Sequence, residues 1–91
     1  MLKATAQLRI VNKKGLHARA SAKFVDTAAR FQSEVTVRKD GHEVSGRSIM
    51  GLMLLGASFG TMIDVSAAGA DAKEAVAALT RLVEAKFQED A

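Results

Sequence analysis

The stretch GLHARASAKF, residues 15–24, sets one histidine between a glycine and the predicted first turn of a helix. Arg19 follows His17 by two positions, and the stretch contains neither an acidic residue nor a cysteine. The first backbone N–H groups of a helix have no acceptor within that helix. Together with the helix dipole they favour an anion and disfavour an imidazolium. A neutral ring is nucleophilic near pH 7, so the pattern favours a histidine that carries phosphate.

The phosphate hypothesis gives each neighbour of His17 a role. Gly15 lets the backbone turn sharply into the helix. Arg19 supplies a forked cation that suits phosphate oxygens. The backbone N–H groups expected to converge on the phosphate are those of Ala18, Arg19 and Ala20.

Both histidines also have an ordinary structural interpretation. His17 could be a helix cap or a solvated loop residue. His42 follows the pair Asp40-Gly41, a strong hairpin signal, and is expected to be a solvated turn residue rather than a site residue.

A second unusual segment begins at Ser48, where IMGLMLLGA follows a residue that caps helices well. Its apolar residues surround the helix axis almost completely, and a short surface helix cannot bury every side. We expect Leu52 and Leu55 to be core. Flexible methionines suit a docking face for more than one partner, although the residues alone leave pure core equally open.

Several other chemistries lack their residues. The chain has no cysteine, and we find no HExxH, no histidine cluster, no GxxxxGK[ST] loop and no GxSxG elbow. A serine–histidine–acid relay would need a distant acid that the sequence does not single out. We therefore expect no metal and no cofactor.

Composition predicts a single globular domain over residues 1–91, with 48% hydrophobic and 25% charged residues. The net charge of +3 comes with a basic lean in the first half, which suits an acidic partner surface. The chain has no Trp or Tyr, and its four Phe lie in or beside predicted helices, so nucleic acid is not an expected partner. The longest apolar stretch, 49–59, is too short to span a bilayer and no signal peptide is evident, which predicts a cytoplasmic protein.

Hydrophobic periodicity predicts the elements that must position these residues. Alternation predicts strands over 5–11, 34–38, 42–45 and 61–67. A helical period predicts helices over 18–31 and after Ser48. Asp71, with Glu74 as its capping-box partner, is expected to begin a long closing helix. The buried stripe of that helix is predicted to be Ala72, Ala75, Val76, Leu79, Leu82, Val83 and Phe87.

The order β-α-β-β-α-β-α indicates an α+β fold in two layers. Each predicted strand has one apolar face and each predicted helix has one apolar stripe. These surfaces can be buried only if the helices pack against the sheet. We expect a four-stranded antiparallel sheet with all three helices on one face. The other face is expected to be wet, with Thr5, Gln7, Arg9, Asp64 and Ser66.

The pair of motifs GLHARASAKFV and SIMGLMLLGA resembles the histidine-containing phosphocarrier (HPr) family of the bacterial phosphoenolpyruvate-dependent phosphotransferase system. The resemblance extends over essentially the whole chain. It implies an open-faced β-sandwich and a monomeric carrier rather than an enzyme with its own turnover. His17 would accept phosphoryl on Nδ1 from phospho-enzyme I and pass it to an enzyme IIA component.

The same resemblance implies further site residues. Arg19 matches the active-site arginine of the family, and Ser48 matches its regulatory serine, the substrate of a serine kinase and phosphorylase. Partner docking is implied for Ile49, Met50, Met53 and Lys23.

One position departs from the family motif, which usually reads G-L-H-A-R-P-A. Ala20 stands in place of the proline and restores an N–H donor, so the fold and the phosphate site should tolerate it. Ala20 and GRSIMGLM are more similar to nitrogen-branch or regulatory carriers than to sugar-uptake ones, and both branches stay open. The alternative is a small interaction module that docks through the Ser48 helix without phosphotransfer.

Overall fold

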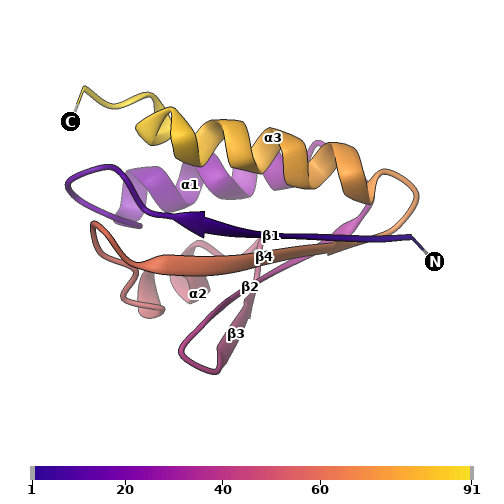
Figure 1. Cartoon of the computed structure of the whole chain (residues 1–91), viewed down its shortest axis with the longest axis horizontal. Helices are drawn as coiled ribbons and strands as arrows, with labels where there is room; N and C mark the ends of the chain where they lie inside the picture. Colours follow the sequence, from indigo (N-terminus) through magenta and orange to yellow (C-terminus); the bar gives the residue numbers. More distant parts are fainter. Residues whose placement is uncertain (1, 91) are drawn as a thin grey trace.

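Two long helices lie side by side over one face of a four-stranded sheet in the computed structural model, which describes residues 2–90 (Figure 1). The sheet order is β1-β4-β2-β3, and every neighbouring pair is antiparallel. In chain order the elements are β1 (Lys3–Arg9), α1 (Ala18–Ala28), β2 (Glu34–Lys39), β3 (His42–Ser45), α2 (Ile49–Leu54), β4 (Met62–Ala68), α3 (Ala72–Glu84) and a short 3-10 turn, η1 (Lys86–Gln88).

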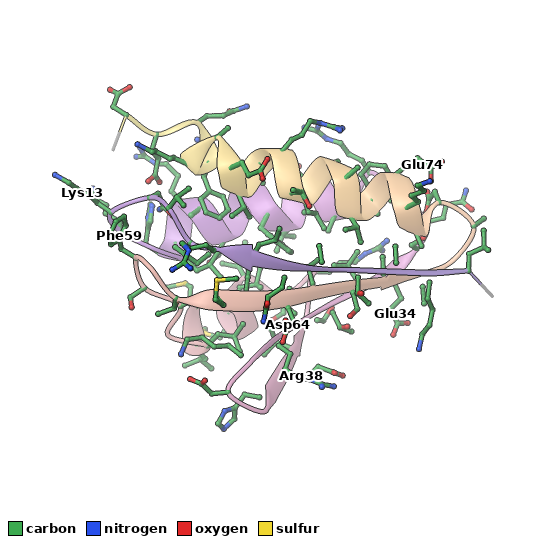
Figure 2. The ribbon with its side chains drawn as sticks, in the orientation of Figure 1. Lys13, Glu34, Arg38, Phe59, Asp64 and Glu74 are labelled. Carbon is green, nitrogen blue, oxygen red and sulfur yellow. The ribbon has the colours of Figure 1, made fainter. Side chains whose placement is uncertain are left out.

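The core lies between the sheet and the helices, as the alternation and the helical stripes predict. Val65 of β4 and Phe24 of α1 are fully buried, and so is Leu79 of α3. Figure 2 shows Asp64 and Arg38 on the side of the sheet away from α1 and α3. Of the residues predicted to be wet, Thr5, Gln7, Arg9 and Asp64 are exposed and Ser66 is half-buried. The open-faced α+β sandwich is therefore confirmed.

The turn between β2 and β3 has the conformation that its sequence predicts. Asp40 and Gly41 both have positive φ, 52° and 80°, as the two-residue hairpin turn requires. His42 follows on the exposed side, which confirms its interpretation as a solvated hairpin residue.

α1 ends at Ala28, three residues before the predicted end. The N–H groups of Arg30 and Phe31 bond to carbonyls three residues back, at 3.1 and 3.2 Å, which tightens the last turn. The next N–H groups, those of Gln32 and Ser33, donate to the carboxylate of Asp71 at 2.9 Å. The backbone N–H groups that would continue α1 therefore bond to Asp71 instead of to carbonyls of the helix.

The same contacts overturn the predicted capping box at α3. Asp71 occupies the N-cap position, but its side chain makes no cap hydrogen bond, since both carboxylate oxygens accept from Gln32 and Ser33.

β1 covers Lys3–Arg9 instead of the predicted residues 5–11. Beyond the strand, Ile10 bonds to the loop before β4, because its N–H donates to the Thr61 carbonyl at 2.8 Å.

Candidate functional site

A tight turn before α1 delivers His17 to the start of that helix. Gly15 has φ +64°, and a Cβ there would collide with the Ala57 carbonyl and lie 2.9 Å from Ser58 Cα. Asn12 is fully buried and ties the turn together: its Nδ2 donates to the Gly15 carbonyl at 2.9 Å. The Leu16 N–H then donates to the Ala57 carbonyl at 2.9 Å. The backbone is thereby fixed immediately before the histidine.

His17 is the N-cap residue of α1 by backbone but not by side chain. Its carbonyl accepts the first helical hydrogen bond, from Ser21 N–H at 2.9 Å, while its ring makes no cap hydrogen bond. The interpretation of His17 as a helix cap is therefore confirmed for its backbone only, because its ring does not cap the helix. Within residues 2–90 no acceptor meets the N–H groups of the three helical residues that precede Ser21, which are Ala18, Arg19 and Ala20.

An acid from the far end of the chain contacts the ring. Nε2 of His17 lies 2.5 Å from Oε2 of Glu89, and Asn12 Nδ2 donates to the other carboxylate oxygen, Oε1, at 3.0 Å. The His17 side chain is 27% exposed and the Glu89 side chain 16%, so the pair is only partly shielded from water. Sequence reasoning did not identify Glu89 as a partner of His17.

Glu89 reaches the site because the chain reverses after α3. Lys86, Phe87 and Gln88 all have positive φ, between 54° and 64°. Phe87 is fully buried, and its carbonyl accepts a hydrogen bond from Lys23 Nζ at 2.7 Å. The buried ring and this bond hold the turn against α1.

The environment of Glu89 favours its ionised form. Burial raises the pKa of Glu89, but hydrogen bonds from His17 and Asn12 and the positive charge of Lys23 lower it, and the resulting pKa lies below the ordinary value. The group facing His17 is therefore a carboxylate at neutral pH.

A shallow hollow opens beside His17 and is predominantly basic. Glu89 and Asp90 form one wall of it together with Gln88. The cations around it are Lys13, Lys14, Arg19 and Lys23. An excess of positive charge next to free N–H groups suits an anion such as phosphate.

The exposed face of α2 is apolar and approaches the histidine. Ser48 caps the helix, its Oγ accepting from Gly51 N–H at 2.9 Å, and Leu52 and Leu55 are buried as predicted. Met53 lines a second hollow together with His17. The exposed apolar side chains are Ile49, Met50, Met53 and Leu54, with Phe59 in the following loop.

The structure therefore adds Glu89, Asn12 and Leu54 to the candidate site. It also gives Lys23 a structural contact within the chain. Glu89 and Asn12 have no sequence signal, because the contact of Glu89 with His17 and the hydrogen bond of Asn12 to Glu89 depend on how α3 and the turn after it pack. Leu54 could have been found, since it lies in the apolar segment after Ser48. Lys23 was expected to dock partners, and it uses its ammonium to hold the turn at Phe87.

Fold and site together define a class: a small open-faced sandwich with one histidine at a helix start, beside a hollow lined mainly by cations. The family model for the HPr component phosphorylation site of the phosphotransferase system matches residues 4–85. The phosphocarrier protein HPr of Neisseria meningitidis is 54% identical over 82 residues, which cover 90% of this chain and 92% of that protein. The phosphocarrier protein NPr of Shewanella violacea is 39% identical over 89 residues, 98% of each.

The solved structures agree with this grouping. The crystal structure of an HPr from Thermoanaerobacter tengcongensis superposes with a TM-score of 0.89 at 47% identity, covering all of both chains. The chain belongs to the HPr family, the phosphocarrier proteins of the phosphotransferase system. Among residues 2–90 no helix is long and apolar enough to cross a membrane.

Proposed function

We propose that His17 accepts a phosphoryl group on Nδ1 from phospho-enzyme I and passes it to an enzyme IIA component. The observation that carries this proposal is the position of the ring. It lies at the start of α1, beside three N–H groups without acceptors and a hollow rich in cations. We further propose that this carrier works as a monomer in the cytoplasm, where it would meet both partners.

The residues around His17 have distinct tasks in the transfer. The lone pair of Nδ1 attacks phosphorus while the bond to the donor atom of enzyme I breaks. Arg19 and the N–H groups at the start of α1 stabilise the charge on the phosphoryl oxygens. The protein contributes position and charge, so it acts as a carrier rather than as an enzyme with its own turnover.

The apolar face of α2 is the proposed docking surface for both partners. Met50 is 69% exposed and Leu54 78%. Neighbouring exposed apolar side chains of this kind commonly mark a site of protein–protein contact. Ile49 and Met53 complete the face, and Met53 lines a hollow together with His17. A partner that covers these side chains would bring its own reacting atom close to the ring.

Ser48 is the proposed regulatory phosphorylation site. It is half-buried at the start of α2, directly before Ile49 and Met50. A phosphate there adds a charge of roughly −1.5 to −2 at the edge of the docking surface, which would oppose a partner that fits an apolar, basic face.

Phosphorylation by enzyme I and phosphoenolpyruvate in the presence of magnesium tests the acceptor. The wild-type protein should gain an acid-labile, alkali-stable phosphate, and His17→Ala should gain none. His42→Ala is the matched control, because it removes the only other histidine from an exposed hairpin and should be labelled like the wild type. Acid-labile phosphate on the His17→Ala protein would contradict the assignment.

The branch follows from which enzyme I reacts faster. Relatives carry both the HPr and the NPr name, and the Ala20 variant of the motif is more similar to the nitrogen branch. The rate of His17 phosphorylation by a sugar-branch and by a nitrogen-branch enzyme I, at equal concentration, assigns the carrier to the faster donor.

A further inference from the structure

We propose that Glu89 is a positioning residue for His17, holding the ring by Nε2 so that Nδ1 presents its lone pair to the incoming phosphoryl group. This inference rests on the proposed function and adds a residue to it. Its starting point is the 2.5 Å contact between His17 Nε2 and Glu89 Oε2.

The chemistry of the two groups fixes the position of the ring proton. An ionised carboxylate can only accept a hydrogen bond, so the nitrogen that it contacts must carry the proton. A neutral imidazole has one proton, and placing it on Nε2 leaves Nδ1 unprotonated. Within residues 2–90 the His17 ring has no hydrogen bond at Nδ1.

The second oxygen of Glu89 is also occupied, which fixes the direction of the carboxylate. Asn12 Nδ2 donates to Oε1 at 3.0 Å and to the Gly15 carbonyl at 2.9 Å. One buried amide therefore joins Glu89 to the turn that places His17. The ring is held from two sides, by its own backbone and through its Nε2 contact.

The backbone before Glu89 indicates that this contact is imposed by the fold. Three successive non-glycine residues, 86–88, have left-handed φ, a conformation that L-residues avoid. Strained backbone persists only where surrounding contacts determine it, and it is concentrated at functional sites. Here the determining contacts are buried Phe87, the Lys23 bond to its carbonyl, and the Glu89 contacts themselves.

The same carboxylate would serve the phosphorylated state. The lone pair of Nδ1 forms the new N–P bond, and the electron pair of the broken bond stays on the donor atom of enzyme I. Nε2 keeps its proton, so the phosphorylated ring carries a positive charge that faces Glu89. The ring therefore keeps one orientation for both acceptance and release.

Ring ¹⁵N NMR of unphosphorylated protein tests the contact without using phosphotransfer. In the wild type, Nε2 of neutral His17 should be protonated and Nδ1 unprotonated. Glu89→Ala removes the partner, and the Nδ1–H tautomer should become measurably populated. Glu89→Gln keeps the size and shape of the side chain and removes its charge. It therefore tests whether the carboxylate charge sets the tautomer, even if the Glu89→Ala protein does not fold.

Transfer kinetics test whether the contact matters for the reaction. With saturating phospho-enzyme I, Glu89→Gln should slow His17 phosphorylation by about tenfold, within the range that misplaced reacting groups cause, and leave the half-saturating concentration unchanged. Glu89→Asp, which keeps the charge, should recover part of the rate. Glu84→Gln is the matched control, because it makes the same change at an exposed position at the end of α3, outside the hollow, and it should behave like the wild type.

The outcomes separate this proposal from the proposed function. Unchanged tautomer populations in Glu89→Ala, unchanged transfer rates in Glu89→Gln, or an equal loss in Glu84→Gln would each overturn the role of Glu89, while labelling at His17 would still stand. Absence of label on wild-type His17 would instead remove the proposed function, and the NMR result would still report the contact.

Discussion

Asp71 at the start of α3 and Ser33, the residue before β2, are joined by two hydrogen bonds to one carboxylate oxygen. Oδ1 of Asp71 accepts from the Ser33 hydroxyl at 2.5 Å and from its N–H at 2.9 Å, while Oδ2 accepts from Gln32 N–H at 2.9 Å. The Ser33 hydroxyl bond, followed by the Gln32 N–H bond, holds the pKa of Asp71 below its ordinary value. This carboxylate connects segments 38 residues apart.

Replacing Asp71 by Asn should therefore destabilise the protein in a pH-dependent way. The lowered pKa in the folded state means that ionised Asp71 contributes stability above its ordinary pKa of 3.8, and that the contribution is lost as the pH falls through the folded value. The difference in free energy of unfolding between wild type and Asp71→Asn should be largest near pH 7 and shrink below about pH 4. Urea unfolding at both pH values measures it.

The control for this series is Asp64→Asn, which removes the same charge from the exposed face of β4. It should change stability little at either pH. A difference for Asp71→Asn that is equally large at pH 7 and pH 2 would show that the carboxylate charge is not what stabilises this junction.

Gly15→Ala should destabilise the protein by more than about 1 kcal/mol, because a Cβ there adds a collision with backbone to the cost of positive φ. Gly56→Ala measures the cost of positive φ alone, since Gly56 has φ +66° and nothing within 4 Å of its Cβ position. Thermal unfolding of both variants measures the difference. Equal losses of stability in the two variants would mean that residues 57–58 move aside at little cost in free energy.

Met50→Glu should weaken enzyme I binding by on the order of 1–3 kcal/mol, mainly through faster dissociation, because it places a charge in the proposed docking surface. Its melting temperature should barely change, since the side chain is 69% exposed. Titration calorimetry gives the affinity. Met62→Glu is the control, at an exposed position on β4. A Met50→Glu protein that unfolds would identify the residue as core instead.

Ser48→Asp should fold normally, because an aspartate oxygen can accept the Gly51 N–H as the serine Oγ does, and it should raise the half-saturating concentration for transfer to His17 without lowering the maximal rate. Ser48→Ala separates the cap from the charge: it should lose about 1 kcal/mol of stability and transfer normally. Authentic phosphoserine protein that transfers like the wild type at sub-saturating concentration would contradict the regulatory role of Ser48.

Local patterns were sufficient for most of the fold. Alternation placed Val65 and Ile63 inward, and Asp40-Gly41 set the hairpin, because these features depend on near neighbours. The end of α1 and the role of Asp71 were wrong, since both depend on a contact between distant segments. The position of His17 at a helix start was predictable from Gly15 and the change in period, whereas Glu89 was not. Left-handed φ at residues 86–88 has no mark in a sequence without glycine there.

The bond from Leu16 N–H to the Ala57 carbonyl joins the turn before His17 to the loop after α2. Through it, the loop that follows one helix serves as the foundation for the start of the other. The spacing between the apolar face of α2 and the imidazole is consequently tied to the backbone. Under the proposed function, successive partners would need to match only this one spacing.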